Sequence, residues 1–181
     1  MVNEIKNLLS KGRFCLAIDG RCAAGKTTLS ERLQKELGCA VIHLDDFFLP
    51  KGMVKDGFGN LEKDRLIRQV LSPMSKGEQV RYQKFSCQSQ RYTDTVTVPV
   101  GMSVIVEGSY SLLPEFRFAY THSVFMDISA DEQEKRIRKR NGDERWAVFQ
   151  SRWIPDEEAY FAAFQSEEYA DLRLSNEIKK D

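Results

Sequence analysis

The stretch AIDGRCAAGKTTLSERL, residues 17–33, decides the fold of this chain. Within it, GRCAAGKT (20–27) matches the pattern G-x-x-x-x-G-K-[ST] of a phosphate-binding loop. The loop follows RFCLAID (13–19), a compact apolar run that predicts a strand. It precedes TTLSERLQKEL (27–37), whose leucines lie four apart and predict a helix ending at Gly38. A strand before the loop and a helix after it are the context that this motif requires, so we predict a bound nucleoside triphosphate, ATP or GTP.

The residue types of this loop suit the chemistry of phosphate binding. Its glycines allow the backbone to curl so that successive N–H groups point at one phosphate, and the start of the following helix adds the positive end of its dipole. Lys26 can bridge the outer phosphates, and the hydroxyl of Thr27 can ligate Mg²⁺. The predicted nucleotide contacts form one continuous run: Gly20, Arg21, Cys22, Ala23, Ala24, Gly25, Lys26, Thr27 and Thr28.

Acidic residues accompany the ends of two other predicted strands. CAVIHL (39–44) is followed by Asp45 and Asp46, and the strand predicted over 103–108 contains Glu107 near its end. In open parallel sheets, ligands sit beyond the carboxyl ends of the strands. Two acids in isolation indicate an ordinary acidic turn, but beside a phosphate loop they can serve magnesium, act as a base or hold a substrate hydroxyl. Either Asp45 or Glu107 could be the general base. The predicted metal ligands are Thr27, Asp45 and Glu107.

An arginine-rich helix is predicted over 130–141. Arg136 and Arg140 lie four apart and share one face of this helix. In a phosphoryl-transfer enzyme, such arginines offset developing charge and close the site against water. The competing interpretation is a solvated face whose basic residues are balanced by neighbouring acids. We assign 130–152 to a lid. The predicted catalytic residues are Lys26, Asp45, Glu107, Arg136 and Arg140.

Strands that alternate with helices, and that read as continuous apolar runs, predict a parallel sheet covered on both faces. We therefore expect a three-layer α/β P-loop fold in one domain, residues 1–181. The polar stretch 78–101 predicts a hairpin inserted on the acceptor side of the sheet. Pro73 is expected to end the helix over 61–74. The other expected elements are a strand over 122–128 and helices over 2–10 and 156–170.

The composition narrows the function classes. The 181 residues include 27 Lys plus Arg and 27 Asp plus Glu, so the formal net charge is zero. A neutral chain gains no general attraction to nucleic acid or to an anionic membrane surface, and no apolar run is long enough for a membrane span. The four cysteines form no CxxC pair, which favours reduced thiols and a cytoplasmic location. A small-molecule acceptor is the expected partner, with the oligomeric state, monomer or homodimer, left open.

Four segments together resemble the uridine kinase-like P-loop kinases: IDGRCAAGKTTL, VIHLDDFFLP, VIVEG, and the arginine-rich helix followed by RWIPDEEAYF. That group includes uridine/cytidine kinases, nicotinamide riboside kinases, bacterial-type pantothenate kinase and phosphoribulokinase. The resemblance implies ATP- or GTP-dependent phosphorylation of a hydroxyl on a small molecule. It also implies that Asp45 activates the acceptor hydroxyl, that Glu107 supports Mg²⁺, and that Arg136 and Arg140 belong to the lid.

The acceptor side departs from the uridine kinase pattern. The Asn-Phe-Asp-His-Pro-Asp stretch that holds the ribose is replaced by VKDGFGNLEKDRL (54–66), which supplies only Asp56. In YQKFSCQSQRY (82–92), Ser86 stands where the family has an acid. A nucleoside or nicotinamide riboside is the first expected acceptor and a vitamin such as pantothenate the second. An NTPase switch and a nucleotide-binding protein without turnover are the rival functions. The predicted substrate contacts are Asp45, Asp46, Phe48, Asp56 and Tyr82.

Overall fold

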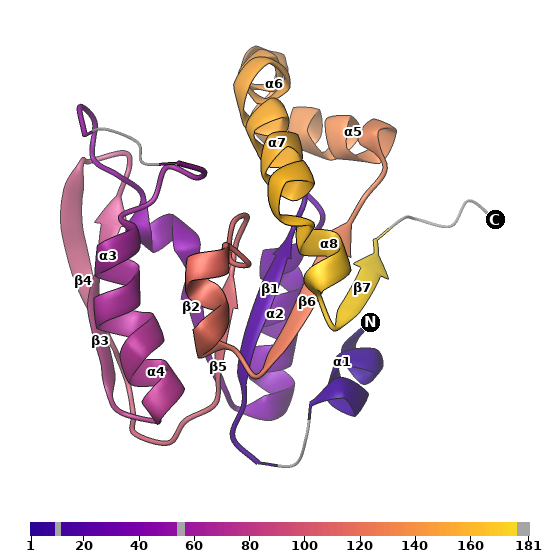
Figure 1. Ribbon diagram of the computed structural model, residues 1–181. Coiled ribbons are helices and arrows are strands. Elements are labelled where there is room, and N and C mark those ends of the chain that lie inside the picture. The colour runs from indigo at the N-terminus through magenta and orange to yellow at the C-terminus, as the bar shows by residue number, and fades with distance from the viewer. Residues whose placement is uncertain (10–11, 54–56, 177–181) are drawn as a thin grey trace.

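The computed structural model describes residues 1–9, 12–53 and 57–176. A five-stranded sheet lies at its centre, with helices on both faces (Figure 1). Within these described ranges, no helix is both long and apolar enough to cross a membrane. The strands of the sheet are β1 (Cys15–Gly20), β2 (Ala40–His43), β5 (Val104–Glu107), β6 (His122–Asp127) and β7 (Leu172–Ser175).

The strand order is β2-β5-β1-β6-β7, and every pairing is parallel. β1 therefore lies in the middle, between β5 and β6. The register places Ile18 of β1 opposite Glu107 of β5, and His43 of β2 opposite the same residue. Because the strands are parallel, the loops that follow β1, β2 and β5 leave the sheet at one edge. The predicted α/β fold with a parallel sheet is confirmed.

Two apolar clusters fill the faces of the sheet. On one face, Leu16 of β1 belongs to a cluster that includes Leu33 from the helix after the phosphate loop. On the other face, Val106 of β5 belongs to a cluster that includes Tyr160 from the C-terminal part of the chain. All four side chains are fully buried. Covering on both faces explains why the strands read as continuous apolar runs.

Eight helices of the described chain surround the sheet, and a separate two-stranded antiparallel hairpin lies beside α3 and α4 (Figure 1). The hairpin strands are β3 (Val80–Ser86) and β4 (Arg91–Val98), within the stretch where a hairpin is predicted. The helices are α1 (Val2–Leu8), α2 (Lys26–Leu37), α3 (Lys63–Leu66), α4 (Ser72–Lys76), α5 (Ala130–Asn141), α6 (Asp143–Val148), α7 (Ile154–Phe164) and α8 (Ser166–Tyr169).

The prediction that Pro73 ends a helix is wrong. A π-helical turn over Ile67–Leu71 connects α3 to α4, and the helical segment continues through Pro73 to Lys76. Proline lacks an N–H and its ring clashes with the carbonyl four residues earlier, whereas a π turn displaces that carbonyl. The same arrangement recurs before α7, where a π-helical turn over Phe149–Trp153 precedes Pro155.

Two further elements differ from expectation. β7 has no counterpart among the predicted strands, because Leu172–Ser175 is short and carries the exposed Arg173 on the outer strand of the sheet. The helix predicted over 156–170 is interrupted at Gln165, whose backbone is left-handed with φ 48°, so α7 and α8 are separate.

Candidate active site

The loop from Gly20 to Gly25 connects β1 to α2 through left-handed backbone. Gly20 has φ 127° and Gly25 φ 98°. A Cβ at Gly20 would lie 2.0 Å from the carbonyl oxygen of Met126, so only glycine fits where the loop passes β6. The Arg21 N–H donates to that same oxygen at 3.1 Å. The backbone N–H groups of the first turn of α2, from Lys26 to Thr28, have no carbonyl partner within the helix, so they are available to bind an anion at the loop.

The Lys26 side chain folds back over the loop. It is only 8% exposed, and its ammonium donates to the carbonyl oxygens of Gly20 at 2.6 Å and Arg21 at 2.9 Å, and to Ser109 Oγ at 3.2 Å. The side chain is thus held at the rim of the loop by three oxygens. An ammonium in this place puts a fixed positive charge beside the amides that a phosphate chain would contact.

Asp19, the residue before the loop, was assigned no role from the sequence. It is 0% exposed, and its carboxylate accepts from the Gly20 and Leu112 amides at 2.6 and 2.8 Å and from Tyr160 Oη at 2.7 Å. The Tyr110 amide adds a fourth bond at 3.1 Å. These donors come from three separate parts of the chain, so Asp19 connects the base of the loop to the segment after β5 and to α7.

The end of β5 brings Glu107 to the loop. Its Oε1 accepts from Thr27 Oγ1 at 3.2 Å and lies 2.5 Å from His43 Nδ1. The hydrogen bond to Glu107 is the main cause that raises the pKa of His43 above its ordinary value. Glu107 itself is buried. The structure therefore brings together the predicted metal ligands Thr27 and Glu107, and adds His43 beside them.

Asp45 and Asp46 lie in a 3-10 turn, Leu44–Phe47, that directly follows β2. Asp45 is exposed, yet loss of hydration by the surrounding protein, followed by the charge of Glu107, raises its carboxyl pKa. Negative charge thus gathers at this end of the sheet, and a cation would relieve it. Among the described residues no three His, Cys, Asp or Glu side chains form a metal cluster by themselves. Mg²⁺ commonly takes only one or two carboxylates together with phosphate oxygens, which fits this donor set.

The residues predicted to contact the acceptor differ in their surroundings. Tyr82 of β3 is buried, and its hydroxyl donates to Asp46 Oδ2 at 2.9 Å. Arg65 donates to the Asp46 carbonyl at 2.7 Å and lies 4.2 Å from the ring centroid of Phe47. Phe48 packs half-buried against the core. Asp56 lies outside the described residues.

Of the two predicted lid arginines, the structure brings only Arg136 to the loop. Its guanidinium donates to the Ala23 carbonyl at 3.3 Å and to the Asn176 carbonyl at 2.7 Å. Asn176, unassigned from the sequence, donates in turn to the Ala24 carbonyl at 2.7 Å. Arg140 is exposed on α5 and donates to its neighbour Asn141.

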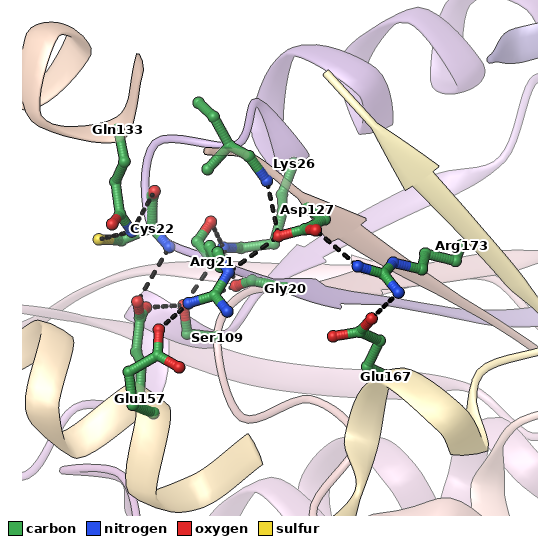
Figure 2. Close-up of polar contacts among 12 residues, drawn as sticks. Gly20, Arg21, Cys22, Lys26, Ser109, Asp127, Gln133, Glu157, Glu167 and Arg173 are labelled. Atoms are coloured by element: carbon green, nitrogen blue, oxygen red, sulfur yellow. Dashed lines mark hydrogen bonds and ion pairs between the residues drawn. The ribbon is translucent and has the colours of Figure 1, made fainter. Parts of the chain in front are cut away.

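The side chains of Arg21 and Cys22 turn toward other elements (Figure 2). Arg21 Nε donates to Asp127 Oδ1 at 2.8 Å, and its guanidinium also pairs with Glu158. Gln133 of α5 donates to the carbonyl of Cys22 at 3.1 Å and to its sulfur at 3.2 Å. These two loop residues therefore connect the loop to β6, α5 and α7.

Ser109 and Glu157 also join the site without a sequence signal that marks them. Ser109 Oγ donates to Glu157 Oε1 at 2.6 Å, and the Cys22 N–H donates to Glu157 Oε2 at 3.1 Å (Figure 2). Ser109 comes two residues after Glu107 and Glu157 lies in α7. In the sequence, Glu157 belongs to an acidic helical run, DEEAYF, that is typical of a solvent-exposed helix face. Only the fold shows that this side chain is buried against the loop.

No protein-family model matches the chain. Human nicotinamide riboside kinase 1 is 30% identical over 159 residues, which cover 82% of this chain and 70% of the human protein. Mouse nicotinamide riboside kinase 1 is 46% identical over 56 residues, covering 30% of this chain and 29% of the mouse protein.

Solved structures share the fold. A possible uridine kinase from Bacillus stearothermophilus superposes with a TM-score of 0.71 at 18% identity, covering 96% of this chain and 94% of that one. D-glycerate 3-kinase from Cryptococcus neoformans superposes with a TM-score of 0.61 at 13% identity, covering 99% and 93%. With the phosphate loop, the acids after β2 and at the end of β5, and the relation to the human kinase, the chain belongs to the uridine kinase-like family of P-loop kinases.

Proposed function

We propose that this small-molecule kinase transfers the γ-phosphoryl group of ATP or GTP to a hydroxyl of a nucleoside-like acceptor, with nicotinamide riboside first. The observation that carries the transfer chemistry is the meeting of Lys26, Thr27, Glu107 and Asp45 at one edge of the sheet. The 30% identity to human nicotinamide riboside kinase 1 over most of the chain supports the acceptor class.

Each of these residues has a role in the proposed reaction. The loop amides and the Lys26 ammonium bind the phosphate chain and offset its charge. Asp45, exposed in the turn after β2, orients the acceptor hydroxyl and takes its proton, because its raised pKa makes it a better proton acceptor than an ordinary carboxylate. Arg136, already at the loop, adds positive charge. Positioning and electrostatics supply most of the rate in phosphoryl transfer.

The proposal includes Mg²⁺, held by Thr27, Glu107 and Asp45 together with phosphate oxygens. When bound, the ion neutralises charge that builds up on the phosphate oxygens. The charge already gathered at Asp45 and Glu107 is the property of this chain that suits a cation.

The experiment that tests the acceptor is ADP or GDP release from purified protein, Mg²⁺ and nucleotide, with separate acceptors. The set contains nicotinamide riboside, uridine, cytidine, pantothenate and D-glycerate. We expect one nucleoside-type acceptor to raise release many-fold above hydrolysis without acceptor. If only pantothenate or D-glycerate raised ADP or GDP release strongly, the acceptor would not be a nucleoside and the proposed acceptor class would be wrong. Steady hydrolysis that no acceptor increases would favour an NTPase switch.

Lys26→Ala tests the transfer machinery. Removing the ammonium should lower kcat by roughly 100- to 1000-fold, since it takes away charge aimed at the phosphates. Lys35→Ala, at the exposed far end of the same helix, is the matched control and should leave kcat within about twofold. Far-UV circular dichroism verifies that both variants are folded. Near-normal turnover of a folded Lys26→Ala protein would contradict the assignment.

A further inference from the structure

Glu157 is a buried carboxylate that contacts the phosphate loop. The side chain is 4% exposed, and both carboxylate oxygens are engaged: Oε2 by the Cys22 N–H at 3.1 Å and Oε1 by Ser109 Oγ at 2.6 Å. Ser109 Oγ in turn lies 3.2 Å from Lys26 Nζ. One carboxylate thus touches a loop amide directly and the loop lysine through one hydroxyl (Figure 2).

The groups around Glu157 are those that a phosphate chain uses. Backbone N–H groups of the loop and the ammonium of Lys26 attract any anion in the same way. A buried carboxylate is costly unless it is paired and hydrogen-bonded. Here the neighbouring guanidinium does not compensate it, because Arg21 is engaged by Asp127 and Glu158. Lys26 is therefore the cation that Glu157 shares with an incoming phosphate.

We propose that the Glu157 carboxylate acts as an internal competitor of the nucleotide: it holds the loop amide in a phosphate-ready orientation and lowers phosphate affinity through its negative charge. The inference rests on the proposed kinase function, because it concerns the same loop. Glu157 is a positioning residue in this scheme, since it acts through Cys22, Ser109 and Lys26.

The direction in which phosphate affinity changes when the Glu157 charge is removed separates this inference from a purely structural role of Glu157. Glu157→Gln keeps the shape and one acceptor oxygen but removes the charge. If the charge opposes phosphate, the variant binds a phosphate chain more tightly, by roughly three- to tenfold. If Glu157 only supports the fold, losing an ideal hydrogen bond leaves binding unchanged or weakens it.

The test measures dissociation constants by isothermal titration calorimetry with tripolyphosphate and with ATP. Tripolyphosphate reports on the phosphate chain alone, so both probes should bind Glu157→Gln more tightly than wild type. Glu168→Gln, which removes the same charge from an exposed position of α8, is the control and should stay within about twofold. Equal or weaker binding by folded Glu157→Gln would overturn the inference and leave the kinase proposal intact. A wild-type protein that binds neither ATP, GTP nor tripolyphosphate would overturn both.

A second measurement needs no variant. In a crystal structure of the wild-type protein with tripolyphosphate, the phosphate chain should have displaced Glu157, so that the Cys22 N–H contacts a phosphate oxygen. Phosphates in the loop with Glu157 still accepting from the Cys22 N–H would contradict direct competition. This measurement keeps the inference testable even if Glu157→Gln does not fold.

Discussion

At the scale of single residues, Cys22 carries a thiol inside the loop that its surroundings make unreactive. Burial, followed by the charge of Glu157, raises the pKa of this thiol to about 12. Only the thiolate reacts with electrophiles and oxidants. At neutral pH the thiolate fraction is therefore roughly one part in 100,000, so the loop is protected from oxidation despite its cysteine.

We predict that iodoacetamide at pH 8 alkylates Cys87, which is exposed, much faster than Cys22. Peptide mass spectrometry over time gives both rates in one sample. The same protein in guanidinium chloride is the control, since all four cysteines should then react at similar rates. Equal rates in the folded protein would show that the Cys22 thiol is more acidic than its surroundings imply.

What the sequence reveals at this scale depends on how local a residue's partners are. The loop from Gly20 to Thr27 is identified from the sequence because the residues that bind phosphate are adjacent and follow a fixed spacing. Asp19 is not, because its donors at Tyr110, Leu112 and Tyr160 lie far along the chain. Glu157 is hidden for the same reason. Arg140 is the converse case: it shares a helical face with Arg136 in the sequence, but only Arg136 reaches the loop.

At the scale of elements, Asp127 at the end of β6 connects the loop to the outer strand. It accepts from Arg21 of the loop and from Arg173 of β7, each at 2.8 Å, and Arg173 also pairs with Glu167 of α8 (Figure 2). Burial alone would raise the Asp127 pKa, but bonds from Arg173, the Ile128 amide and Arg21 outweigh it and hold the pKa below its ordinary value.

Asp127→Asn should lower the free energy of unfolding by about 1–2 kcal/mol at pH 7. A carboxyl whose pKa is depressed by folding stabilises the protein above the unfolded pKa, near 3.9, and loses that contribution as the pH falls through the folded pKa. The difference between wild type and variant should therefore be constant above about pH 4 and shrink below it.

Urea unfolding between pH 3 and pH 8 measures this difference. Asp94→Asn, the same chemical change at an exposed position of β4, should show no comparable difference at any pH. A wild-type advantage over Asp127→Asn that persists undiminished well below pH 4 would mean that packing, and not the charge, makes the contribution.

Helices and strands were predictable where the pattern of apolar residues was clear. They were poorly predictable where contacts with distant parts of the chain determine the local structure. β1, β2, β5 and β6 all read as apolar runs, and β1 and β5 are buried along their whole length. β7 pairs only with β6, and its Leu-Arg-Leu-Ser alternation is too short to stand out. The helix that continues through Pro73 depends on a π turn, and no residue spacing in the sequence announces one.

At the scale of the whole molecule, the contacts predicted for nucleotide and those predicted for acceptor come from different parts of the chain. The phosphate loop lies between β1 and α2, whereas the hairpin of β3 and β4 lies beside α3 and α4 (Figure 1). The hairpin contacts the turn after β2 through the bond from Tyr82 to Asp46. Since Tyr82 is buried, we expect it to act on an acceptor through the Asp46 carboxylate that accepts its hydrogen bond.

Tyr82→Phe should therefore raise the KM for the acceptor by roughly five- to tenfold and leave the KM for ATP within about twofold, because it frees Asp46 without touching the loop. Steady-state kinetics with each substrate varied in turn measure the two constants. Tyr92→Phe, the same change at an exposed hairpin residue that bonds Glu62, is the control. Equal rises in both constants would show that the hairpin supports the whole site.

The central place of β1 in the sheet has a consequence for synthesis on the ribosome. β1 ends at Gly20, yet its two neighbours begin only at Val104 and His122. While the first hundred or so residues emerge, this strand, buried along its whole length in the folded protein, has both edges unpaired, which is the state that chaperones protect from aggregation. Nucleotide can assist folding only after β6 has left the exit tunnel, because Met126 and Asp127 complete the loop.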